Sequence, residues 1–187
     1  MPRAQRRAQV LDAAAAAFAG AGFAGTSMDD VAAAAGVTRL IVYRNFPSKE
    51  ELYRAVLERV ATRLSQEFGA LPGPPERGRA TARALLRVAR EQPDGFRLLW
   101  VHAAHEPAFA SYAADWRALA VDYAATLLAP ALHDRRRLAW AAQVVVDHVY
   151  DAVLAWLELG DASDDEACVE LVAAGLRAII PAWADIP

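Results

Sequence analysis

The sequence is poor in cysteine and in lysine. Its 187 residues include one cysteine, Cys168, and one lysine, Lys49, so that nearly all of the 20 basic residues are arginines. A single cysteine excludes a disulfide within the chain and a zinc site built from cysteines. The sequence also lacks a Gly-rich phosphate loop and the motif of a catalytic nucleophile, so no motif in it predicts an enzyme.

Long apolar runs are absent as well. No uninterrupted run reaches the roughly 18–20 residues that a membrane-spanning helix needs. The start of the chain does not resemble a signal peptide, because Asp12 interrupts the alanine run that follows Arg3, Arg6 and Arg7. These absences predict a cytoplasmic protein that does not enter a membrane.

Alanine is the residue that the sequence has in excess. There are 45 alanines, and 56% of the residues are hydrophobic, which is enough apolar material for a core. Alanine is the best helix former and a poor strand former. The composition therefore argues against an all-β fold and against disorder, and it predicts an all-α protein of one or two small domains.

The charge is divided unevenly along the chain. Residues 1–70 contain nine Arg or Lys and seven Asp or Glu, a net charge of +2, whereas residues 71–187 contain eleven and sixteen, a net charge of −5. A mildly basic N-terminal part is compatible with nucleic-acid binding, although many ordinary domains differ by as much.

The clearest break in the sequence is the segment 71–75, Leu-Pro-Gly-Pro-Pro, because three prolines in five residues cannot continue a helix. It predicts a first part over residues 1–48, a connecting helix over 49–71 and a second part over 72–187. About nine helices are expected, with ranges 3–20, 27–34, 38–45, 48–68, 75–91, 93–104, 107–129, 134–159 and 164–183. Gly22 is expected to end the first helix, and Ser163 with Glu166 to cap the start of the last.

Residues 27–45 have the form of a short helix, a turn at Gly36 and a second short helix. This is the helix-turn-helix arrangement, in which the second helix enters the major groove of DNA. By itself the pattern fits an ordinary helical hairpin equally well. The second helix presents polar, basic and small apolar groups, as the reading of base edges and phosphates requires.

The longer stretch from residue 25 to residue 57 closely resembles the DNA-binding domain of the TetR family of bacterial transcriptional regulators. The features that carry the resemblance are Gly22-Phe23, Thr26-Ser27, Asp30-Val31-Ala32, Ala35-Gly36-Val37 and the pattern from Tyr43 through Phe46-Pro47-Ser48-Lys49 to Leu52. The resemblance covers roughly residues 8–60, a third of the chain.

The resemblance implies a set of DNA-binding residues: Thr26, Ser27, Thr38, Arg39, Leu40, Tyr43, Arg44, Asn45 and Lys49. Of these, Thr26, Ser27 and Lys49 would contact phosphate. The chain departs from the family pattern at Leu40, Ile41 and Asn45, which puts the base-by-base readout in doubt. Arg3, Arg6 and Arg7 fit a basic arm that contacts DNA, but a solvated N-terminus is the interpretation we favour slightly.

The second part concentrates aromatic and histidine residues on its middle helices. A stripe of this kind is more often core than ligand pocket, whereas apolar walls with a few polar groups are typical of a pocket. The resemblance implies that a small effector binds here. The candidate pocket residues are Phe96, Trp100, His105, Tyr112, Trp116, Tyr123 and His148. His102, His105 and Glu106 have metal-ligand spacing but no further strong ligand nearby, so no metal and no cofactor is expected.

The last two long helices, 134–159 and 164–183, are expected to form a dimer surface, because the family dimerises through a four-helix bundle. The faces predicted to meet are Leu138, Ala142, Val145, Val149, Ala152 and Trp156 on one helix, and Leu171, Ala174, Gly175, Ala178 and Ile179 on the other. Burial of both faces within one chain is the alternative.

The resemblance implies a ligand-responsive regulator, a repressor that binds a palindromic operator as a dimer and is released by a small-molecule effector. Two alternatives from other classes remain. One is a helical protein-interaction module, and the other is an enzyme that uses the aromatic and histidine residues of the second part.

Overall fold

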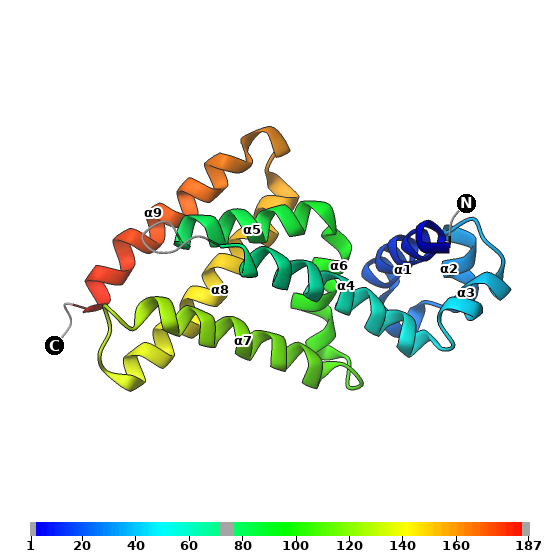
Figure 1. Ribbon diagram of the computed structural model, residues 1–187, viewed down its shortest axis with the longest axis horizontal. Helices are drawn as coiled ribbons and strands as arrows, with labels where there is room; N and C mark the ends of the chain where they lie inside the picture. The colour runs from blue at the N-terminus through cyan, green and yellow to red at the C-terminus, as the bar shows by residue number, and fades with distance from the viewer. Residues whose placement is uncertain (1–2, 72–76, 185–187) are drawn as a thin grey trace. The chain divides into compact units, whose positions relative to one another are not determined.

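The computed structural model describes residues 3–71 and 77–184, and all the regular structure in these residues is helical (Figure 1). The α-helices are α1 (Arg3–Gly25), α2 (Met28–Ala34), α3 (Arg39–Asn45), α4 (Lys49–Gly69), α5 (Arg77–Glu91), α6 (Pro93–Arg97), α7 (Ala110–Leu128), α8 (Arg135–Leu159) and α9 (Asp165–Ala184). A π-helical turn, η1 (Leu98–His102), and two 3-10 turns, η2 (Ala103–His105) and η3 (Ala162–Asp164), complete the set. The predicted all-α fold is confirmed for these residues.

Most helix ends lie within a few residues of their predicted positions. Gly22 interrupts α1 with a φ of 74°, a value that favours glycine, and a short helical end follows it. Two predictions are wrong in detail. The helix expected over 93–104 changes from α to π to 3-10 geometry along its length. The last helix is not capped by Ser163, because the Asp161 carboxylate accepts a hydrogen bond from the Ser163 N–H and opens a 3-10 turn there.

The structure divides into two compact units, and the first contains Met1–Arg63 and Gln92–Ala113. Within it, α1 contacts α2, α6 and η1, and α2 contacts α3. An aromatic cluster stabilises this core: the Tyr53 ring lies 4.9 Å from that of Phe18, 5.3 Å from that of Phe23 and 4.4 Å from that of Phe109, measured between centroids.

The second unit contains Leu64–Glu91 and Ala114–Pro187. In it α5 packs against α8 and α9 and buries an apolar face that includes Leu85, Leu86 and Val88. Beside this apolar face, α5 carries arginines that pair with carboxylates of α9. The pairs are Arg79 with Glu170, Arg83 with Glu166, and Arg90 with Asp165. Ion pairs therefore connect these two helices at several points along their length.

The proline-rich segment that predicts the domain boundary lies almost wholly outside the described residues. The three-part division at residues 48 and 71 stays a prediction. The compact units group the chain differently, because residues 92–113 pack in the same unit as α1, α2 and α3. The helix α4 contributes to both units, with its residues up to Arg63 in the first and those from Leu64 in the second.

In the part of the chain that the structure describes, three helical stretches are long and apolar enough to cross a membrane by length and composition alone: Arg3–Gly25, Arg135–Leu159 and Ala162–Ala184. This finding corrects the prediction that no stretch reaches this threshold. The reason is the high alanine content, which raises the mean hydropathy of a helix even where charged residues interrupt its apolar run.

Candidate functional site

The helix α2 begins at a capping box formed by Ser27 and Asp30. The Ser27 hydroxyl accepts a hydrogen bond from the Asp30 N–H, and the Asp30 carboxylate accepts one from the Ser27 N–H at 2.8 Å. The hydrogen bonds from Ser27 hold the pKa of Asp30 below its usual range. Ser27 thus fixes the start of α2, and its side chain is exposed at the surface.

The turn between α2 and α3 requires glycine. Gly36 has a φ of 61°, in the left-handed region that other L-residues rarely adopt. The two helices pack around Val31 and Val42, which are fully buried, and around Ala35. This geometry is the predicted helix-turn-helix, with α3 as the second helix.

The helix α3 itself contains no acidic residue, and one side of it is exposed. Leu40 is 65% exposed and Tyr43 is 36% exposed, and the side chains of Thr38, Arg39 and Arg44 are exposed as well. This side combines two guanidinium groups, two hydroxyls and an apolar side chain, and these are groups that can contact DNA phosphates, base edges and thymine methyl groups.

The Arg39 guanidinium already has interaction partners within the protein. Its guanidinium lies 2.9 Å from the Asp29 carboxylate and donates to the Tyr43 hydroxyl at 3.3 Å. It also lies over the Tyr43 ring, 5.2 Å from the centroid. Because both members of the ion pair are well exposed, the pair is weak and water competes with it. Asp29 would therefore compete with a base or phosphate for Arg39.

Thr26 occupies a different place from the one predicted. Its side chain is 3% exposed, and its hydroxyl donates to the carbonyl oxygens of Gly22, at 2.8 Å, and Ala17, at 3.1 Å. The hydroxyl therefore satisfies carbonyls at the end of α1 and does not face solvent. This corrects the expected phosphate contact from the Thr26 side chain.

Lys49 also makes contacts inside the first unit. Its ammonium group donates to the carbonyl oxygens of Phe23, at 2.8 Å, and Thr26, at 3.0 Å. It lies 4.4 Å from the centroid of the Phe23 ring. Two of its three N–H groups thus tie the start of α4 to the end of α1, which the sequence pattern did not predict.

The end of α3 faces a surface hollow of about 420 Å³. The residues that line it are Arg3, Arg6, Ile41, Arg44 and Asn45. The Asn45 amide donates to the Ile41 carbonyl at 2.8 Å, so its N–H₂ group is engaged within α3. Arg3 and Arg6 belong to the first turns of α1.

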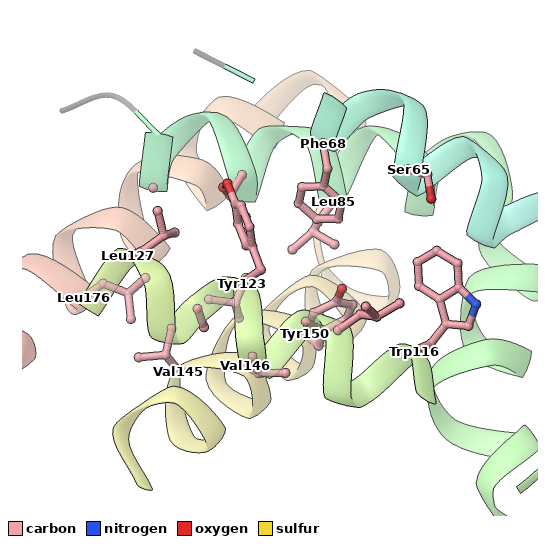
Figure 2. Close-up of a pocket in the computed structure, with 16 residues that line it drawn as sticks. Ser65, Phe68, Leu85, Trp116, Tyr123, Leu127, Val145, Val146, Tyr150 and Leu176 are labelled. Atoms are coloured by element: carbon pink, nitrogen blue, oxygen red, sulfur yellow. The ribbon is translucent and has the colours of Figure 1, made fainter. Parts of the chain in front are cut away.

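The second unit contains a largely apolar pocket of about 360 Å³ (Figure 2). Side chains from α4, α5, α7, α8 and α9 line it, and those labelled in the figure include Phe68, Leu85, Trp116, Tyr123, Tyr150 and Leu176. Its described lining contains no Arg, Lys, His, Asp or Glu side chain. A charged group buried there would lose its hydration without gaining an ionic partner.

A few polar groups meet at this pocket. The hydroxyls of Thr81 and Tyr123 lie 3.3 Å apart, within hydrogen-bond distance. The Phe68 and Tyr123 rings lie 5.5 Å apart between centroids. Burial raises the pKa of Tyr150 far above its usual range, so its hydroxyl stays neutral. Apolar walls with a small number of hydroxyls are the usual construction of a small-molecule site.

A second cavity of about 670 Å³ shares several of these lining residues and extends the space toward arginines. It is lined by Arg77, Arg79 and Arg177, among others. Arg79 and Arg177 both lie near the Glu170 carboxylate, at 2.8 Å and 4.0 Å. The cationic groups are therefore next to the apolar pocket and outside it.

Of the seven predicted pocket residues, Trp116 and Tyr123 line the apolar pocket. The other five do not: Phe96, Trp100, His105, Tyr112 and His148. Phe96 is buried in the core of the first unit, and His105 is exposed, with its Nδ1 atom 2.8 Å from the Val101 carbonyl. Sequence periodicity missed Phe68, Leu85 and Tyr150, because these residues lie on three different helices. Among the described residues, no group of three or more His, Cys, Asp or Glu could hold a metal ion.

The outer surface of α8 and α9 carries large exposed apolar side chains. They are Trp140 and Leu159 on α8, with Leu171 and Ile179 on α9. His148 of α8 lies beside Gly175 of α9. The face predicted for α9 is thus at the surface. The face predicted for α8 is wrong, because Ala142 and Val149 are buried and Val145 and Val149 line the pocket.

Comparison with known proteins agrees with this architecture. Residues 10–56 match the family model of bacterial regulatory proteins of the tetR family. The HTH-type transcriptional activator FasR of Mycolicibacterium smegmatis is 34% identical over 104 residues, which cover 54% of this chain and 48% of FasR. The chain therefore spans about half the length of this relative.

Two solved structures share the fold. A TetR-like transcriptional regulator from Rhodococcus sp. RHA1 has a TM-score of 0.77 and 24% identity, over 95% of this chain and 98% of that one. AibR, solved with isovaleryl coenzyme A and operator DNA, has a TM-score of 0.66 and 20% identity, over 90% of this chain and 97% of its own. These similar proteins are transcriptional regulators and not enzymes.

Proposed function

We propose that this chain is a transcriptional repressor that binds operator DNA and is released by a small molecule, because residues 10–56 match the family model of bacterial regulatory proteins of the tetR family. The observation that carries the proposal is the exposed side of α3, a helix without acidic residues, built on a helix-turn-helix whose turn requires Gly36. Such a helix fits the major groove, with Tyr43 and Arg44 near base edges and phosphates.

DNA binding is tested by gel shift and footprinting on the promoter region beside the gene. The double variant Tyr43→Ala/Arg44→Ala is expected to lose sequence-specific binding and to keep its helical content. A matched control is Arg136→Ala, which removes an exposed arginine at the start of α8. Absence of sequence-specific binding by the unaltered protein at moderate salt would contradict the proposal.

We expect the sign of regulation to be negative, since a dimer bound over a promoter blocks polymerase. FasR is named an activator. A promoter fused to a reporter therefore gives the second measurement: deletion of the gene should raise expression from its own promoter. A fall in expression would make the protein an activator with the same DNA-binding surface.

Dimerisation is proposed through the exposed apolar side of α8 and α9. Its four large side chains, Trp140, Leu159, Leu171 and Ile179, would be covered by the same side chains of a second copy. A two-fold dimer carries two α3 helices, and it would read a palindromic operator with half-sites separated by whole turns of the duplex.

The apolar pocket is proposed as the effector site. AibR is an example of a structurally similar protein that binds a small molecule, isovaleryl coenzyme A. Here the pocket favours the uncharged, apolar part of an effector, with the Thr81 and Tyr123 hydroxyls as hydrogen-bonding groups. A ligand longer than this pocket would meet the arginines of the adjoining cavity. Effector binding would shift the population away from the DNA-binding conformation.

A further inference from the structure

The apolar pocket of the second unit and the larger cavity beside it share part of their walls. The residues that line both are Gly78, Ala124, Leu127, Val145 and Leu176. None of the five has a polar side chain, so the described boundary between the two cavities is apolar. Figure 2 shows Leu127, Val145 and Leu176 at the opposite end of the pocket from Trp116. The larger cavity therefore adjoins the pocket at the end that is away from Trp116.

The two cavities differ in charge. No Arg, Lys, His, Asp or Glu side chain is found in the described lining of the apolar pocket. The described lining of the larger cavity contains Arg77, Arg79 and Arg177 but no Asp or Glu, and its other residues are apolar except Thr126. The Thr126 hydroxyl donates to the Tyr123 carbonyl at 2.7 Å. A molecule that occupied both cavities would thus meet apolar walls in one and guanidinium groups in the other.

The Glu170 carboxylate neutralises one of these arginines. Arg79 Nε lies 2.8 Å from Glu170 Oε1, and Arg79 Nη2 donates to Oε2 at 2.9 Å, so both carboxylate oxygens are engaged by the same guanidinium. Arg177 Nη2 lies 4.0 Å from Oε2, which is too far for a hydrogen bond. Together the three side chains carry one excess positive charge.

Arg177 is the side chain best placed to bind an anion in the larger cavity. Its side chain is 60% exposed, so a ligand can reach the guanidinium without first breaking a hydrogen bond to Glu170. A guanidinium group binds a carboxylate or a phosphate with two parallel hydrogen bonds. A neutral ligand would leave this capacity unused.

We propose that the two cavities form one elongated site for an amphipathic anion, a molecule with an apolar chain that ends in a carboxylate or a phosphate. The chain extends through the pocket toward Trp116, and the anionic head pairs with Arg177. The opposite orientation would bury the charge where no ionic partner lines the pocket. The inference rests on the proposed effector site and names the chemical class of the effector.

The experiment is isothermal titration calorimetry of the full chain with three probes that share one alkyl chain: decanoate, decyl phosphate and decanol. The unaltered protein should bind at least one of the two anions, and the tighter of them identifies the preferred head group. In the variant Arg177→Gln, the Kd of that anion should rise about three- to tenfold, since one partly exposed charged contact is lost. The Kd of decanol should stay unchanged.

Two further variants locate the head and the chain. Arg177→Lys keeps the charge and should recover most of the affinity for the anion. Ala120→Trp fills the pocket that holds the chain and should abolish binding of all three probes. The matched control Arg136→Gln makes the same change in net charge at an exposed position that lines neither cavity, and it should bind every probe normally.

Three results would overturn the inference. They are an equal loss of affinity for the anion and for decanol in Arg177→Gln, binding of neither anion by the unaltered protein, and undiminished binding by Ala120→Trp. Circular dichroism verifies that each variant stays folded. None of these titrations contains DNA, so failure of the proposed function is distinguished by the gel shift, in which the unaltered protein would then bind no operator.

Discussion

At the scale of single residues, Tyr53 places a polar hydroxyl group in a well-packed apolar core, which lowers the stability of the fold. Its ring is fully buried between Phe18, Phe23 and Phe109, and its hydroxyl is the buried side-chain polar atom that lacks a hydrogen-bond partner among the described residues. Burial raises the pKa of Tyr53 to about 12, so the group is neutral at physiological pH. An unsatisfied buried hydroxyl costs about 1–3 kcal/mol.

The variant Tyr53→Phe is therefore expected to be as stable as the unaltered protein or up to about 1–3 kcal/mol more stable. Thermal or urea denaturation followed by circular dichroism measures the change. Tyr123→Phe serves as the control, because the Tyr123 hydroxyl has a partner in Thr81 and its removal should give no gain. A clear loss of stability for Tyr53→Phe would show that its hydroxyl is hydrogen-bonded in solution.

Gly36 supplies the second prediction at this scale. Alanine at a left-handed φ costs about 1–2 kcal/mol, so Gly36→Ala should destabilise the helix-turn-helix and weaken DNA binding. The control is Gly20→Ala in α1, where nothing lies within 4 Å of the added methyl group. Because glycine is unfavourable inside a helix, this control should be neutral or stabilising. Denaturation and gel shift on both variants provide the measurements, and equal destabilisation would contradict the argument.

At the scale of the helices, the pairing of α5 with α9 makes stability depend on pH. The Asp165 carboxylate accepts hydrogen bonds from the Arg90 guanidinium and from the Trp156 indole N–H, at 2.8 and 2.9 Å. The hydrogen bond from Arg90 holds the pKa of Asp165 below its usual range, and the Trp156 bond adds to the effect. The folded state therefore binds a proton at this carboxylate less readily than the unfolded state does.

The direction in which stability changes with pH follows from the lowered pKa of Asp165. The stabilisation from Asp165 is fully present above the pKa of an unfolded aspartate, which is about 3.9. It is lost as the pH falls from there through the lower folded value. Melting temperatures measured from pH 6 down to pH 3 should fall less steeply for Asp165→Asn than for the unaltered chain. Parallel curves for the two proteins would show that the pair contributes nothing.

The helices also show how much of the fold can be predicted from the sequence. Their positions are predictable because alanine favours helix everywhere and Gly22, Gly36 and the prolines interrupt it. Which side of a helix faces inward is harder to predict when both sides are apolar. On α8, Val145 and Val149 looked like a dimer face and instead line the pocket, while Trp140 is exposed.

The same limit explains why only some of the site residues could be predicted from the sequence. The exposed positions of α3 follow from the motif, since a short helix after a fixed turn has one side available. Thr26 and Lys49 also match the motif, but their polar atoms bond to carbonyls at the end of α1, and no local pattern reveals such contacts. Phe96 has the periodicity of a pocket residue, but it is buried in the other compact unit, which only the three-dimensional packing determines.

At the scale of the whole molecule, the exposed face of α8 and α9 predicts the oligomeric state. Leu171 on this face is 66% exposed, and a charge placed there would be desolvated in a dimer. Leu171→Glu should give a folded monomer with much weaker operator binding, as measured by analytical ultracentrifugation and gel shift. The control Ala118→Glu changes an exposed position of α7, outside α8 and α9. Dimers of undiminished affinity for Leu171→Glu would place the interface elsewhere.

Regulation gives the last prediction at this scale. Ala120 lines the apolar pocket, and Ala120→Trp would fill much of its volume. The variant should bind operator DNA and repress a reporter, but it should no longer respond to the inducing molecule. Ala118→Trp, at an exposed position of the same helix outside the pocket lining, is the control and should respond normally. Normal induction of the Ala120 variant would exclude this pocket as the effector site.

The scarcity of lysine offers a way to measure local opening of each compact unit. Lys49 provides the only side-chain amine in the sequence, and its ammonium group is bonded to two carbonyls in the first unit. Cys168 provides the only thiol and is buried in the second unit, where burial raises its pKa. Each compact unit therefore has one chemically unique side chain. Because both groups are engaged or buried, the rates at which amine and thiol reagents modify them would report local opening of each unit separately, in the unaltered protein.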